Sequence, residues 1–110
     1  MSTMEGWKRA PRVIASLTVV LSKGSAHYVV ETKNVSERGL CFGSKEVFPV
    51  GSEHHLVFGQ PPELPRLSAQ GIVRWSESGK GVGVEFTSMS PEDQQALLEF
   101  VDSQSRSTQA

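Results

Sequence analysis

One short polar segment has the residue types and spacing of a binding turn. Asn34, Ser36 and Gly39 lie in the sequence Asn-Val-Ser-Glu-Arg-Gly, between two apolar runs. Asn and Ser side chains hydrogen-bond neighbouring backbone groups in turns, and we expect Gly39 to supply a positive φ at little cost. The segment therefore predicts a tight turn that carries hydrogen-bond donors and acceptors.

A cationic cluster made of Lys8, Arg9 and Arg12 lies upstream of this turn. Pro11 biases the residue before it toward extended backbone, and side chains of an extended chain alternate faces. Lys8 and Arg12 then point the same way, and Arg9 points to the other side. We interpret residues 1–12 as a flexible basic arm. Together with the polar turn, such an arm suits a ligand with phosphates and base edges, whereas the alternative is a solvated basic tail.

Length and overall charge exclude several classes of protein. The 110 residues make one domain, and a net charge of -1 with a pI near 6.3 argues against a general nucleic-acid binder. The single Cys41 excludes an internal disulfide, and its apolar neighbours favour a buried structural thiol over a nucleophile. No apolar run approaches the ~20 residues that span a bilayer. We expect a cytoplasmic domain without membrane insertion.

Alternation of apolar and polar residues predicts six strands joined by turns. The expected strands cover Val13–Leu21, Tyr28–Thr32, Leu40–Phe42, Glu53–Phe58, Leu67–Ser76 and Gly81–Phe86. Gln60–Pro65 contains three prolines and is expected to be an exposed connection. Trp75 continues the apolar face of its strand, which allows either a core or a ligand-facing position. Gly81 and Gly83 suggest the close approach of another group.

One helix is predicted after the strands. Ser90 is a good N-cap, Pro91 occupies the first helical position, and acidic residues fill the first turn. Its apolar stripe consists of Ala96, Leu97, Phe100 and Val101. We expect residues 103–110 to be a disordered tail. The fold class is therefore all-β: a six-stranded antiparallel split barrel with a C-terminal helix over residues 13–102.

The order of these features resembles the PilZ domain family. Members carry a basic arm, Arg-x-x-x-Arg, and then a strand pair joined by (Asp/Asn)-x-Ser-x-x-Gly, which Asn34, Ser36 and Gly39 match completely. The segments Gly71–Trp75 and Gly81–Phe86 are similar to the last hairpin of the family. The resemblance covers nearly the whole expected folded part.

The resemblance implies a PilZ-like barrel that binds cyclic di-GMP, a bacterial second messenger, often as a stacked dimer. Arg12 corresponds to the second arginine of the arm and would grip phosphate and guanine edges through its planar donors. Asn34 and Ser36 would hydrogen-bond a guanine edge, and Gly39 would allow the turn. Trp75 sits where some members place an aromatic ring against a guanine face, a contact of about 1–3 kcal/mol in nucleic-acid systems.

The arm departs from the family pattern at its first arginine, which is Lys8 here. Lysine keeps the charge but makes no bidentate contact, and the change would cost on the order of 1.5–3 kcal/mol. That corresponds to about ten- to a hundredfold in affinity. Arg9 would compensate only if the arm were not extended, and Trp7 stands where many relatives carry another basic residue.

The resemblance to the PilZ family implies two alternative functions. The first is a cyclic di-GMP receptor that relays its signal to a protein partner in motility, adhesion or polysaccharide machinery. The second is an adaptor of the same fold that binds the nucleotide weakly or not at all because of Lys8.

The sequence does not favour an enzyme, a metal protein or a DNA- or RNA-binding protein. His54 and His55 are adjacent and would point to opposite faces of a strand, and no Cys or carboxylate pattern completes a metal site. Ser36 has no His and acid that would form a triad. Single-strand nucleic-acid binding needs a basic groove with several exposed aromatic residues. We therefore expect no catalytic residues and no cofactor.

Overall fold

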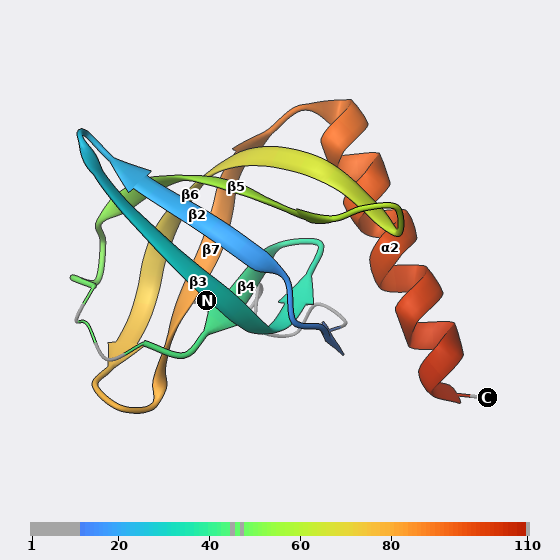
Figure 1. Cartoon of the computed structure of the whole chain (residues 1–110), viewed down its shortest axis with the longest axis horizontal. Coiled ribbons are helices and arrows are strands. Elements are labelled where there is room, and N and C mark those ends of the chain that lie inside the picture. Colours follow the sequence, from blue (N-terminus) through green and yellow to red (C-terminus); the bar gives the residue numbers. More distant parts are fainter. Residues whose placement is uncertain (1–11, 45, 47, 110) are drawn as a thin grey trace, which may run out of the picture.

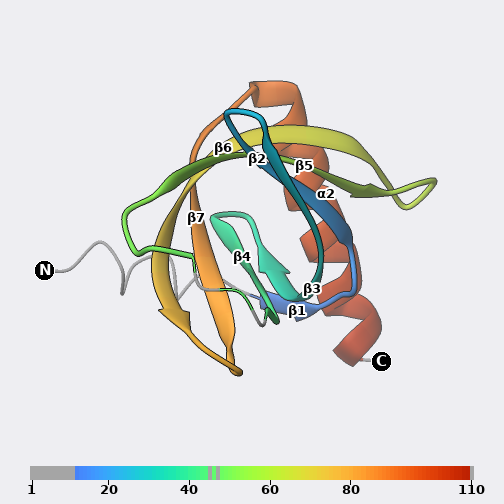
Figure 2. The ribbon, with the colours of Figure 1, turned by 60° about the vertical axis from the view of Figure 1, so that its left-hand side comes forward.

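The alternating runs of the sequence form a closed antiparallel barrel (Figure 1). The structure, a computed structural model, describes residues 12–44, 46 and 48–109. Its elements are β1 (Arg12–Ile14), β2 (Thr18–Lys23), β3 (Ala26–Ser36), β4 (Gly39–Phe42), β5 (Glu53–Gln60), β6 (Leu64–Glu77), β7 (Gly81–Met89) and α2 (Pro91–Gln109). Six strands pair in the order β3-β2-β5-β6-β7-β4, and β4 pairs back with β3 to close the ring (Figure 2). The predicted six-stranded barrel with a C-terminal helix is confirmed, with β1 as one extra strand.

The first expected strand is divided into β1 and β2 by the side chain of Thr32. The Leu17 amide donates to Thr32 Oγ1 at 2.8 Å, and this hydroxyl donates to the Ala15 carbonyl. A side chain thus occupies the place of regular ladder bonds, and the single strand expected over Val13–Leu21 is wrong. Strand β3 consequently pairs with β2 along its first half and with β1 at Asn34 to Ser36.

Strand β6 begins earlier than the prolines suggested. Gln60 pairs with Leu64, and Leu64 and Pro65 belong to β6, so only the residues between these partners form the connection. Leu64 is fully buried. The exposed connection expected over Gln60–Pro65 is therefore too long, because the burial of Leu64 extends the strand past Pro65.

The barrel encloses one apolar core that α2 completes on one side (Figure 1). The largest fully buried side chains are Phe42, Phe58, Leu17, Leu21, Leu40, Leu56, Leu64, Leu67, Leu97, Val19 and Val35. Helix α2 packs against β6, β1 and β3 through its buried Leu97, Phe100 and Val101. These are three of the four residues of the expected apolar stripe.

The helix begins as predicted and ends later. Ser90 Oγ accepts from the Asp93 amide at 3.2 Å, which is the expected N-cap. The structure continues α2 to Gln109, whereas the sequence analysis expected disorder over residues 103–110. No Gly or Pro stands between Ser103 and Gln109 to end the helix.

His54 lies in the interior of the barrel with an orphaned ring nitrogen. The Ser52 hydroxyl donates to the Pro49 carbonyl at 2.6 Å and lies 3.0 Å from His54 Nε2. Since that hydroxyl has only one proton, Nε2 must be the donor in their bond. His54 Nδ1 is then an unprotonated acceptor, buried without a partner in the part of the chain that the structure describes. Burial lowers the pKa of His54, and the nearby charge of Lys23 lowers it further.

The stability of the barrel is expected to fall as the pH drops below about 6.5, the pKa of an unperturbed histidine. Because the pKa of His54 is lowered in the folded state, the unfolded chain binds more protons in this range. Thermal unfolding at pH 7.5 and 5.5 measures the effect. In a His54→Gln variant this component should be lost, and it should persist in His27→Gln, which changes an exposed histidine of β3. An equal pH dependence in all three proteins would contradict the assignment.

Candidate functional site

Most of the residues expected to bind a ligand meet on one outer face of the sheet. The strand register places a single row across five strands: Ile14, Asn34, Cys41, Gly83 and Trp75. Their chain neighbours Val13, Val35, Leu40 and Val84 are buried in the core, so the row itself faces outward. Asn34 and Trp75 are three strands apart, about 14 Å at the usual spacing. They can therefore contact different parts of one ligand.

Arg12 stands at the start of β1, where the expected arm meets the barrel. It is exposed and pairs in register with Ser36. Its Nη1 atom lies 3.9 Å from the Sγ atom of Cys41, so the guanidinium extends over the middle of the outer row. Cys41 is buried, as expected. The other two residues of the expected basic arm, Lys8 and Arg9, lie outside the described residues.

Asn34 and Ser36 belong to β3, and the turn itself consists of Glu37 and Arg38. Ser36 Oγ accepts from the amides of Arg38 and Gly39 at 3.1 and 3.2 Å and donates to the Gly39 carbonyl. The hydroxyl is buried and its bonds are used by the turn. The half-buried Asn34 amide, in contrast, has no hydrogen-bond partner among the described residues, and it is available to a ligand.

The prediction that Gly39 has a positive φ angle is wrong. Positive φ angles occur at Gly24, Gly51, Gly79 and Gly81, and Gly39 is not among them. The Ser36 hydroxyl closes the turn without a left-handed residue. Gly39 instead begins β4, where it is buried and pairs with Glu85.

Trp75 lies on the outer face because of a β-bulge. The register between β6 and β7 shifts between Val73 and Trp75, which turns Trp75 away from the core and pairs it with Gly83. A Cβ atom on Gly83 would lie 2.6 Å from Trp75 Cδ1 and still closer to Nε1. The indole therefore rests directly on the backbone of Gly83. Of the two positions open to Trp75, the structure favours the outer one, and the glycine spacing was the signal in the sequence.

Sequence reasoning missed Lys33. A second register shift, between Thr32 and Asn34, brings Lys33 to the same exposed side as Asn34. Regular alternation would have put these two neighbours on opposite faces. A basic residue beside the Asn of the motif was the only available signal.

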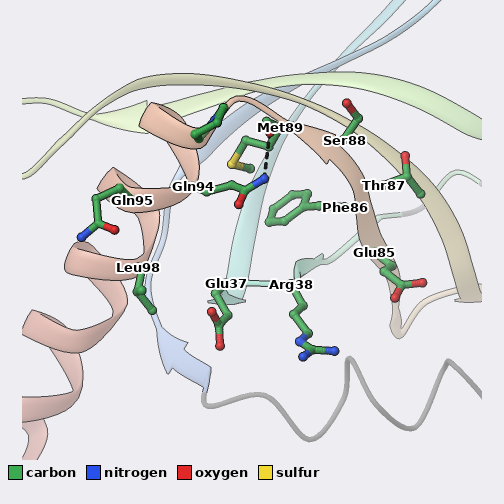
Figure 3. A pocket seen from close by; sticks show the side chains of 11 residues that line it. Glu37, Arg38, Glu85, Phe86, Thr87, Ser88, Met89, Gln94, Gln95 and Leu98 are labelled. Atoms are coloured by element: carbon green, nitrogen blue, oxygen red, sulfur yellow. Dashed lines mark hydrogen bonds between the residues drawn. The ribbon is translucent and has the colours of Figure 1, made fainter.

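A hollow lies on the other side of the Glu37-Arg38 turn. It is a groove of about 570 Å³ between β7, this turn and the start of α2. Figure 3 shows Phe86 pointing into it, with Leu98 and Gln94 on the helix side. No residue expected to bind the ligand lines it. The outer row and the groove are connected through the Glu37-Arg38 turn, because the Phe86 amide donates a hydrogen bond to the Arg38 carbonyl at 2.8 Å.

The described residues contain neither a cluster of metal ligands nor a helix that could span a membrane. No group of three or more His, Cys, Asp or Glu side chains there is arranged to hold a metal ion. No helix within that part of the chain is both long and apolar enough to cross a membrane.

The described residues form a small β-barrel with three polar or aromatic groups gathered on one outer face. Arg12 offers planar cationic donors, Asn34 an amide and Trp75 an aromatic ring. The PilZ domain model matches residues 8–103. The chain therefore belongs to the PilZ domain family.

Two solved structures share this fold. The inhibitor of motility MotI/DgrA of Bacillus subtilis superposes with a TM-score of 0.82 at 21% identity, over 93% of this chain and 53% of that chain. PlzA of Borreliella burgdorferi, solved in complex with c-di-GMP, gives 0.61 at 12% identity, over 90% and 44%. This chain thus spans about half the length of MotI/DgrA and less than half of PlzA. The search of curated proteins found no match.

Proposed function

We propose that this PilZ domain is a cytoplasmic receptor for cyclic di-GMP. The observation that carries the proposal is the outer face: the guanidinium of Arg12 extends over the outer row, and the amide of Asn34 and the ring of Trp75 lie in that row. Family membership and the complex of PlzA with c-di-GMP support the choice of ligand. The domain binds rather than catalyses, and it needs no cofactor for this role.

The geometry of the outer face supports three nucleotide contacts. Arg12 holds a phosphate or a guanine edge, Asn34 hydrogen-bonds a base edge, and Trp75 stacks on a base. Ser36 acts through the turn that it closes, since its hydroxyl is already bonded to the backbone. The ligand binds as one molecule or as a stacked dimer.

The signal passes to a protein partner, and the shared turn supplies a route. A ligand bound at Arg12 and Asn34 lies next to the turn that follows Ser36. In that turn the carbonyl of Arg38 accepts a hydrogen bond from the amide of Phe86, which lines the groove. Leu98, which is 42% exposed, offers an apolar contact there for a segment of the partner. The name of MotI/DgrA, an inhibitor of motility, favours motility machinery over adhesion or polysaccharide export.

Calorimetric titration of the whole chain with cyclic di-GMP tests the proposal. We expect saturable binding, reduced about two- to tenfold by Asn34→Ala, since a neutral hydrogen bond contributes about 0.5–1.5 kcal/mol. Gln60→Ala removes an amide at the exposed end of β5 and should leave the affinity unchanged. GMP at the same concentrations should compete poorly, because it lacks the second base.

An absence of binding heat and of any shift in melting temperature at high concentrations of cyclic di-GMP would refute the proposal that the domain is a receptor. The adaptor that has lost nucleotide binding through Lys8 would then be the better description. Binding that Asn34→Ala leaves unchanged would place the ligand on another surface of the barrel.

A further inference from the structure

Lys33 extends from β3 across the end of β4. A Cβ atom on Gly43 would lie 3.1 Å from Lys33 Cε, which places the lysine stem over the outward side of Gly43. The Nζ atom then donates to the carbonyl of Lys80 at 2.8 Å, in the hairpin between β6 and β7. One backbone contact thus fixes an exposed cation at the edge of the outer face.

The hairpin that holds this cation also borders the ring of Trp75. Lys80 precedes Gly81, and Trp75 Cη2 is 3.4 Å from the place where a Cβ atom of Gly81 would stand. The ammonium is therefore bonded one residue away from Gly81, which the far edge of the indole approaches. Only one of its three donors is used by the carbonyl, so two remain for an anion.

Lys33 is also a cation without a carboxylate beside it. The ammonium of Lys80 lies 3.2 Å from Glu77, and Arg74 lies 2.7 Å from Glu85. Lys33 has no such partner among the described residues. Its charge is therefore available to a ligand.

We infer that Lys33 forms a second phosphate subsite, and that one ligand bridges the guanidinium of Arg12 over Cys41 and the ammonium of Lys33 at the β6–β7 hairpin. The inference rests on the proposed function and adds to it. A cyclic dinucleotide carries two phosphates, one on each side of a base, so a base stacked on Trp75 brings a phosphate to its edge. This second cation offsets part of what Lys8 withholds, since it supplies charge from the barrel itself.

The test is the calorimetric titration of the whole chain with cyclic di-GMP at several salt concentrations. Lys33→Gln should weaken binding about tenfold, as expected for one charge-assisted hydrogen bond. It should also lower the slope of log affinity against log salt by about one. Lys33→Arg should keep the salt slope of the unmodified protein. The matched control is Lys23→Gln, which removes the same charge at the hairpin of β2 and β3, about 23 Å along β3 from Lys33.

The possible results separate the two proposals. If the unmodified protein binds and Lys33→Gln behaves like Lys23→Gln in affinity and salt slope, the subsite is wrong and the receptor stands. A weaker affinity with an unchanged salt slope also overturns the subsite, because a phosphate contact must change the slope. If the unmodified protein does not bind, the proposed function and this inference fall together.

Discussion

Arg12→Ala is expected to weaken cyclic di-GMP binding by about ten- to a hundredfold, the value of a charge-assisted contact of about 1.5–3 kcal/mol. Arg12 is exposed and stands on the extra strand, so the loss should appear in affinity with little change in melting temperature. Calorimetry with cyclic di-GMP measures it. Arg66→Ala is the matched control: it removes an exposed arginine on β6 at about 30 Å from Trp75, and it should bind like the unmodified protein.

The counterpart in the same titration is Lys8→Arg, which restores the basic arm of the family. A planar guanidinium at position 8 should tighten binding by about the same factor that Arg12→Ala loses. If both variants bind like the unmodified protein, the arm does not contact the ligand. If only Lys8→Arg binds at all, the natural chain is the adaptor rather than the receptor.

Gly83→Ala is expected to weaken binding by up to about a hundredfold, although it adds only one methyl group. That methyl would overlap the indole of Trp75, so the ring must leave its place on the outer face. The stacking contact that is lost amounts to about 1–3 kcal/mol. Calorimetry gives the affinity, and tryptophan emission reports the displacement of the ring.

Gly24→Ala separates this effect from a general loss of stability. Gly24 has a φ of 60° with open space around it, in the hairpin of β2 and β3. Alanine there strains the backbone and lowers the melting temperature, but it should leave the affinity intact. Trp75→Ala should match Gly83→Ala in affinity. If Gly83→Ala changes neither emission nor affinity, Trp75 is not a stacking platform.

Alternation and turn chemistry were sufficient to predict the barrel and the start of the helix. The buried residues Val19, Leu21, Val82 and Val84 fall on the predicted faces, and Ser90 caps α2. These features depend on neighbours along the chain, which a sequence displays directly.

The differences arise where a distant side chain or a register shift intervenes. The hydroxyl of Thr32 divides a strand that periodicity joins, because its partners Ala15 and Leu17 come from another part of the sequence. Bulges near Lys33 and Trp75 change the face of single residues. Periodicity has no signal for such a bulge, so the orientation of the site residues required the structure.

The groove beside α2 was also beyond the sequence. Leu98 follows the buried Leu97 on the helix but is not part of the predicted apolar stripe, and it is exposed and lines the groove. A groove forms between elements distant in sequence, and no local pattern encodes it.

The extra strand β1, which carries Arg12, can open locally while the six-stranded ring stays folded. Strand β1 is joined to β3 by three register pairs and buries Val13, whereas the ring of six strands closes without it. Releasing β1 would cost about 1.5–3 kcal/mol for Val13, together with its few backbone bonds and its contacts with α2, which is less than the cost of opening the ring. The segment that presents Arg12 can therefore detach and reattach as a unit of local unfolding, and a bound nucleotide would clamp it against a body that stays folded throughout.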